Sequence, residues 1–163
     1  MGRFHYESSV GGDLYRRSLY SFWRRSVAPT AFFDAAKRRN CEVRQVRTNT
    51  PLHALNLLND DNYIEAAHNL AIQAIDRYES KQQRIKFLFR SVISRSPSDK
   101  ELRILAKQLD DIANEFARGP HAADELAHVG QGDLPKHIRT PELATYMMLS
   151  STILNLDEAI TRE

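Results

Sequence analysis

An arginine-rich segment in front of a predicted helix start offers the best candidate for a binding site. Arg44 and Arg47 precede the run Thr48-Asn49-Thr50-Pro51, in which Thr50 is suited to cap a helix that begins at Pro51. The first N–H groups of a helix are unpaired and carry the positive end of the helix dipole, so they attract anions. Together with the two arginines, they could hold a carboxylate or a phosphate.

A structural interpretation of the same segment competes with the anion site, and we favour it. The polar residues at the cap then satisfy the helix N–H groups themselves, and the arginines pair with acids of the same chain. We expect in particular that Arg47 forms a buried or half-buried pair with Asp157, Glu158 or Asp60. The candidate anion-binding or structural ion-pair site comprises Arg44, Arg47, Thr48, Asn49, Thr50, His53, Asp60 and Asp157.

Cysteine catalysis is the next chemistry to consider. Cys41 and His53 could act as a nucleophile and base, with Asn49 or Asp60 orienting the imidazole. However, no nucleophile elbow or glycine-rich phosphate loop surrounds this cysteine, and free cysteines are more often inert and packed. A single cysteine also excludes an internal disulfide and a haem attached through two thioethers. We therefore assign no catalytic residue.

The six histidines do not show the spacing of a metal site. None is followed by another at i+4, and the chain lacks a His-Glu-x-x-His motif. The adjacent pairs of acidic residues point in different directions on a helix, so they are typical of caps and solvated faces. We expect neither a metal nor a cofactor. The histidines are His5, His53, His68, His121, His128 and His137.

The charge of the chain is unevenly distributed. Residues 1–50 carry ten Lys and Arg against four acids, a net +6, whereas the remainder carries thirteen against seventeen, a net −4. The two parts can attract each other within one fold, or the basic part can face an anionic partner such as nucleic acid. The longest uncharged stretch, residues 143–156, is shorter than the about 20 residues that cross a bilayer.

The elements that position these residues are predicted to be helices. Apolar residues recur with helical spacing, no segment alternates with period two, and 163 residues suit a single domain. We predict an all-α fold, an irregular bundle of about five main helices. The best-formed helix should be 99–116, behind the capping-box pair Ser98 and Glu101, and the apolar segment 140–156 should lie at the centre. Other predicted helices are 13–27, 50–58, 60–78 and 85–95. We expect a flexible tail at 1–12, a basic irregular loop at 26–49 and a flexible connector at 119–139 with a possible short turn of helix in it.

Four segments together resemble one known family. They are Asp13 to Arg25, Phe33-Asp34, the stretch from Cys41 to Asp60 with its Arg-Thr-Asn-Thr-Pro-Leu run, and the Leu-Asn-Leu-Asp-Glu ending at 154–158. The chain resembles the domain of unknown function 1553, a C-terminal module of large planctomycete proteins. His53 departs from the pattern, because the family commonly has Gln at this position.

The resemblance implies a context rather than a reaction. Family members are typically exported and carry an upstream cytochrome c-like module and a companion domain, and no catalytic residues are established for them. By itself, the N-terminus of this chain lacks a secretory signal and is typical of a cytoplasmic protein. The chain would then be a fragment, and we expect apolar faces at 15–23 or 146–156 to be partly uncovered.

The function that we expect is that of a non-catalytic helical module, which docks to companion domains of an exported assembly or associates with itself. One alternative is a part of an enzyme that acts on carbohydrate or sulfated polymer, completed by missing domains. A second alternative is nucleic-acid binding through the basic N-terminal part, although no recognised nucleic-acid motif is present.

Overall fold

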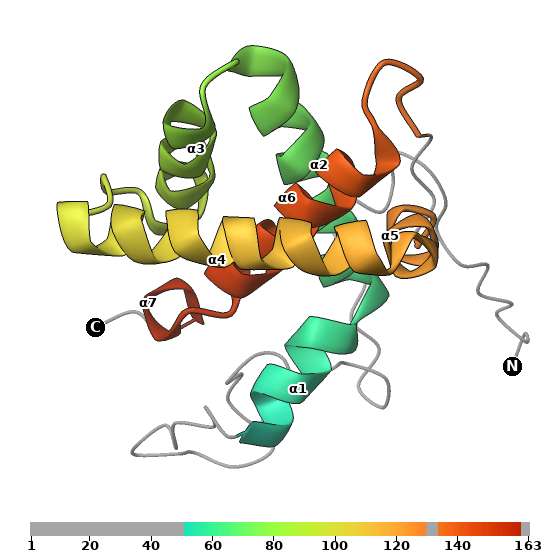
Figure 1. Cartoon of the computed structure of the whole chain (residues 1–163). Coiled ribbons are helices and arrows are strands. Elements are labelled where there is room, and N and C mark those ends of the chain that lie inside the picture. The colour runs from blue at the N-terminus through green and yellow to red at the C-terminus, as the bar shows by residue number, and fades with distance from the viewer. Residues whose placement is uncertain (1–50, 130–133, 161–163) are drawn as a thin grey trace, which may run out of the picture. The chain divides into compact units, whose positions relative to one another are not determined.

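The computed structural model describes residues 51–129 and 134–160, apart from the side chains of residues 51–53 and 56. The chain divides into two compact units, Met1–Gln45 and Val46–Glu163, and all described residues belong to the second. Seven helices and no strand are found in the described residues (Figure 1). The predicted all-α class is therefore confirmed. The helices are α1 (Pro51–Asn59), α2 (Asp61–Arg77), α3 (Lys81–Ile93), α4 (Asp99–Arg118), α5 (Pro120–Ala127), α6 (Thr140–Leu154) and α7 (Asp157–Ile160).

A single residue separates α1 from α2. Asp60 has an extended backbone, and its Oδ1 accepts hydrogen bonds from the backbone N–H and the side-chain amide of Asn62, at 3.0 and 3.1 Å. The carboxylate therefore satisfies one of the N–H groups that a helix start leaves unpaired. The predicted helix break and cap at this position are confirmed.

Helix α6 is the centre of the described unit. It packs against α2, α3, α4, α5 and α7. Met148 is the one exposed residue between 141 and 155, and the others are buried or half-buried. Helix α2 contributes three fully buried alanines at helical spacing, Ala67, Ala71 and Ala74. Their small side chains permit a short distance between the axes of α2 and α6. The central position that we predicted from the apolar sequence is confirmed.

Helix α4 begins with the predicted capping box. The Ser98 hydroxyl accepts a hydrogen bond from the Glu101 backbone N–H at 3.3 Å, and the Glu101 carboxylate accepts one from the Ser98 backbone N–H at 2.7 Å. Leu105 and Leu109 are buried on one face, as the apolar stripe predicts. The helix continues to Arg118, two residues beyond its predicted end.

The segment 119–139, which we expected to be a flexible connector with a possible short turn of helix, contains the two-turn helix α5. Pro120 occupies the start of this helix, where its missing N–H costs nothing. Ala123 and Ala127 are fully buried, and the helix packs against α4 and α6. Because glycines and prolines lie at both ends of the segment, the helix is too short to show a clear apolar stripe in the sequence. The predicted tail 1–12, helix 13–27 and loop 26–49 lie outside the described residues.

Candidate functional site

Most of the predicted site lies outside the part of the chain that the structure describes. This holds for Arg44, Arg47, Thr48, Asn49 and Thr50, and also for Cys41. His53 lies in α1, but its side chain is not among those described. The anion cradle before Pro51 therefore stays a prediction.

The acids that we considered as partners of Arg47 lie at two helix starts. Asp60 is half-buried and caps α2, whereas Asp157 and Glu158 are exposed in the first turn of α7. Glu158 is paired with Arg95. A buried or half-buried pair between Arg47 and one of these acids stays a prediction.

Arg95 joins two carboxylates that come from distant parts of the chain. Its Nη1 and Nη2 donate to Glu101 at 3.0 and 2.7 Å, and its Nε and Nη2 donate to Glu158 at 2.7 and 2.6 Å. The guanidinium carbon lies 4.9 Å from the ring centroid of Phe89, a cation–π distance. The turn after α3, the start of α4 and the start of α7 are therefore held together by one side chain.

This arrangement changes the ionisation of its members. Hydrogen bonds from the Arg95 side chain, and then from Ser98, lower the pKa of Glu101 to about 2. The hydrogen bond from Arg95 also lowers the pKa of Glu158, and the two carboxylates raise the pKa of Arg95. All three groups remain charged near neutral pH. We interpret the cluster as a structural cross-link, because one guanidinium is shared by two carboxylates that belong to different helices.

A buried histidine lies on α2, on the turn after Glu65. The side chain of His68 is 2% exposed, its Nε2 has no hydrogen-bond partner, and Glu65 is also buried. Burial lowers the pKa of His68, while the negative charge of Glu65 acts in the opposite direction. The histidine is therefore held in its neutral form at neutral pH. The sequence alone gave no signal that distinguishes His68 from the other histidines.

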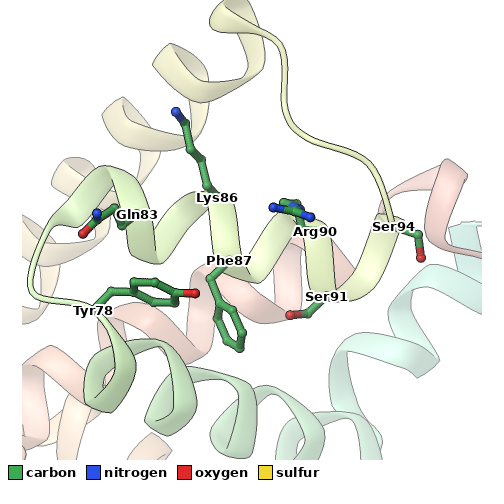
Figure 2. Close-up of a pocket in the computed structure, with 7 residues that line it drawn as sticks. All are labelled: Tyr78, Gln83, Lys86, Phe87, Arg90, Ser91 and Ser94. Carbon is green, nitrogen blue, oxygen red and sulfur yellow. The ribbon is translucent and has the colours of Figure 1, made fainter.

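An open groove runs along one face of α3 (Figure 2). It has a volume of about 620 Å³, within the range of small-molecule sites. Tyr78 follows the end of α2, and the other lining residues recur on one stripe of α3 and its cap. The lining residues are Tyr78, Gln83, Lys86, Phe87, Arg90, Ser91 and Ser94. We missed this groove in the sequence because we followed only the apolar stripe of α3.

Among the side chains that the structure describes, few large apolar ones are exposed, and they lie on three helices. Leu55 and Leu58 of α1 are 55% and 43% exposed, Ile104 of α4 is 56% exposed and Met148 of α6 is 39% exposed. The uncovered face that we expected at 146–156 is thus reduced to Met148, because five helices pack around α6. The other expected face, 15–23, lies outside the described residues.

Metal sites and membrane spans are both absent from residues 51–129 and 134–160. No group of three or more His, Cys, Asp or Glu side chains there could hold a metal ion. No helix among them is long and apolar enough to cross a membrane.

The fold and its sites define an all-helical domain in which helices pack around one central apolar helix. The chain belongs to the family described as protein of unknown function DUF1553 (PSD1), whose model matches residues 3–109. The match confirms the family resemblance. It ends within α4, so the Leu-Asn-Leu-Asp-Glu ending that we included in the resemblance lies outside the matched region. Among curated proteins and solved structures, none matches the chain significantly.

Proposed function

We propose that this chain is a non-catalytic helical module that docks to a companion protein of the same assembly through α1. The observation that carries the proposal is the outer face of this helix. Leu55 and Leu58 are three positions apart and therefore lie on the same face, and both are exposed. Two apolar anchors at this spacing fit a hydrophobic groove on a partner.

The composition of α1 supports the same proposal. The helix has the sequence PLHALNLLN, so neither its first nor its last turn contains a charged residue. A surface helix of a globular protein normally carries charged residues on its outer face. Helix α1 therefore presents an uncharged outer face that is better suited to a protein surface than to water.

Helix α1 contacts α2, and local hydrogen bonds order its C-terminal end. Leu57, which lies between the two exposed leucines in sequence, is only 1% exposed. At the end of the helix, the Asn59 side-chain amide donates to the Leu55 carbonyl at 2.7 Å, and Asp60 then caps α2. A helix end that is already ordered loses little conformational freedom on binding, which favours affinity.

Isolated exposed apolar residues elsewhere need no partner to explain them. Ile104 follows Arg103 and lies three positions before Lys107, both exposed, so its surroundings are charged. Single exposed apolar side chains are common on soluble proteins. Ile104 and Met148 therefore provide a control surface with two exposed apolar side chains.

The proposal is tested by titrating the full chain with each purified protein encoded next to it. Calorimetry should detect one binding partner. The double variant L55Q/L58Q should bind it at least about tenfold more weakly, because buried anchors at an interface each contribute more than about 1 kcal/mol. The control I104Q/M148Q should change the affinity by less than about twofold.

Three results would contradict the proposal. They are the failure of every neighbouring protein to bind, an equal loss of affinity in both double variants, and a wild-type dimer in sedimentation that L55Q/L58Q dissociates. The last result would show that α1 binds a second copy of the chain instead of a companion.

A further inference from the structure

The cations on and beside α3 divide into two groups. Three of them are matched by acids of other helices: Lys81 pairs with Asp110, Arg84 pairs with Glu142, and Arg95 pairs with Glu101 and Glu158. Lys86 and Arg90 form no ion pair or side-chain hydrogen bond within the described part of the chain, and both are exposed. These two unmatched cations are the ones that line the α3 groove.

The groove has a cationic part and an aromatic part. Figure 2 shows Lys86 and Arg90 on the upper side of α3 and the rings of Tyr78 and Phe87 on its lower side. The two ring centroids are 5.5 Å apart. A third cation, Arg77, lies over the Phe87 ring with its guanidinium carbon 5.3 Å from the centroid. No acidic side chain is among the described residues that line the groove.

Hydroxyl groups complete the lining. Ser91 lies beside Phe87, and Ser94 follows the end of α3 with φ of 66°, in the left-handed region. This conformation is easier for glycine than for serine, which makes Ser94 an unusual residue for a helix C-terminus. Both serines can donate a hydrogen bond to an oxygen of a bound anion.

We propose that the α3 groove binds a small organic oxyanion, a phosphate or sulfate ester carried on a ring. Lys86 and Arg90 are four positions apart, so their Cβ atoms are about 6 Å apart on one face and both cations can reach one tetrahedral anion. Ser91, which follows Arg90 in the chain, supplies a further hydroxyl donor. The ring of the ligand packs beside Tyr78 and Phe87. This inference is independent of docking through α1, because it concerns a different helix and a different ligand.

The test uses four probes: phenyl phosphate, phenyl sulfate, inorganic phosphate and inorganic sulfate. We expect one or both phenyl esters to shift the backbone amide NMR signals of residues 78 and 83–94 with a Kd of about 0.1 mM, and the corresponding inorganic anion to bind at least about tenfold more weakly. Preference between the two phenyl esters tells which oxyanion the groove selects. Equal binding of an ester and its inorganic anion would overturn the proposed role of the ring.

Variants separate a built site from general attraction to positive charge. K86Q/R90Q should weaken binding of the preferred phenyl ester at least about tenfold. The control R103Q/K107Q removes the same two types of charge at the same spacing from the exposed face of α4 and should leave Kd within about twofold. Equal weakening in the two double variants, or an absence of signal changes in residues 83–94 at 10 mM of every probe (on the order of 100 times the expected Kd), would refute the proposal.

Discussion

Arg95 and Glu158 are joined by two hydrogen bonds of 2.7 and 2.6 Å although they lie 63 positions apart in the chain. Through this pair the short C-terminal helix α7 is attached to the turn that connects α3 with α4. The same guanidinium holds Glu101, whose carboxylate is part of the capping box of α4. The position of the C-terminal helix and the start of α4 are thus coupled through one arginine.

The Arg95 cluster should make stability depend on pH in the acid range. The folded pKa values of Glu101, about 2, and of Glu158 lie below the ordinary 4.5, so the unfolded chain binds protons first as the pH falls. The contribution is complete above pH 4.5 and is lost toward pH 2. In thermal melts, wild type should exceed R95Q in Tm at pH 6, and the difference should shrink as the pH falls to about 2. A difference that does not change with pH would contradict this account.

His68 should make the folded state sensitive to milder acid. The pKa of His68 in the folded chain lies below the ordinary 6.5. As the pH falls through 6.5, the histidine is therefore protonated in the unfolded chain before it is protonated in the folded chain, and the folded state loses stability. The denaturant midpoint of wild type should therefore drop between pH 8 and pH 5.5 by more than that of H68Q. H121Q, which changes an exposed histidine, should follow wild type. If the denaturant midpoint of H68Q falls as much as that of the wild type, the pH dependence arises from other titratable groups.

Neighbouring residues on α6 should differ sharply in their effect on stability. Leu149 is fully buried, so Leu149→Ala should cost about 2–5 kcal/mol through lost contacts and a cavity. Met148 is exposed, and Met148→Ala should change the free energy of unfolding by less than about 0.5 kcal/mol. Urea melts of both variants measure the contrast. Similar costs at the two positions would argue against α6 as the central helix.

The capping box of α4 should contribute measurably to stability. Ser98→Ala removes the hydroxyl that accepts from the Glu101 backbone N–H and should cost about 1 kcal/mol. Ser98→Asp keeps an acceptor at the cap and should recover most of this loss. Urea denaturation compares the stability of wild type, Ser98→Ala and Ser98→Asp. If Ser98→Asp is no more stable than Ser98→Ala, the capping role is refuted.

Regular local signals made much of the described fold predictable. The Asp60 cap, the Ser98 and Glu101 capping box and the apolar sequence of α6 each depend on residues close together in the chain. Such signals indicate where helices begin and which face is buried. Helix α5 was expected only as a possible short turn, because only two turns separate its flanking glycines and prolines, and its buried contacts are the small Ala123 and Ala127.

The polar sites were less predictable because they depend on distant pairs. We considered Glu158 as a partner of Arg47, but it pairs with Arg95, which the helical pattern does not distinguish from other surface arginines. Lys86 and Arg90 stand out only because the other cations of α3 are matched by acids of α4 and α6. Charge matching between helices follows from their packing, and it is not encoded by spacing along one segment.

The central claim, that α1 is the docking surface, is tested most directly by hydrogen exchange of its backbone amides with and without the companion protein. The account predicts that residues 55–59 of the full chain exchange several-fold more slowly in the complex, while the segment 103–107 of α4, which carries the exposed Arg103, Ile104 and Lys107, is unchanged. Unchanged exchange of α1 in a saturated complex, or protection confined to other helices, would contradict it.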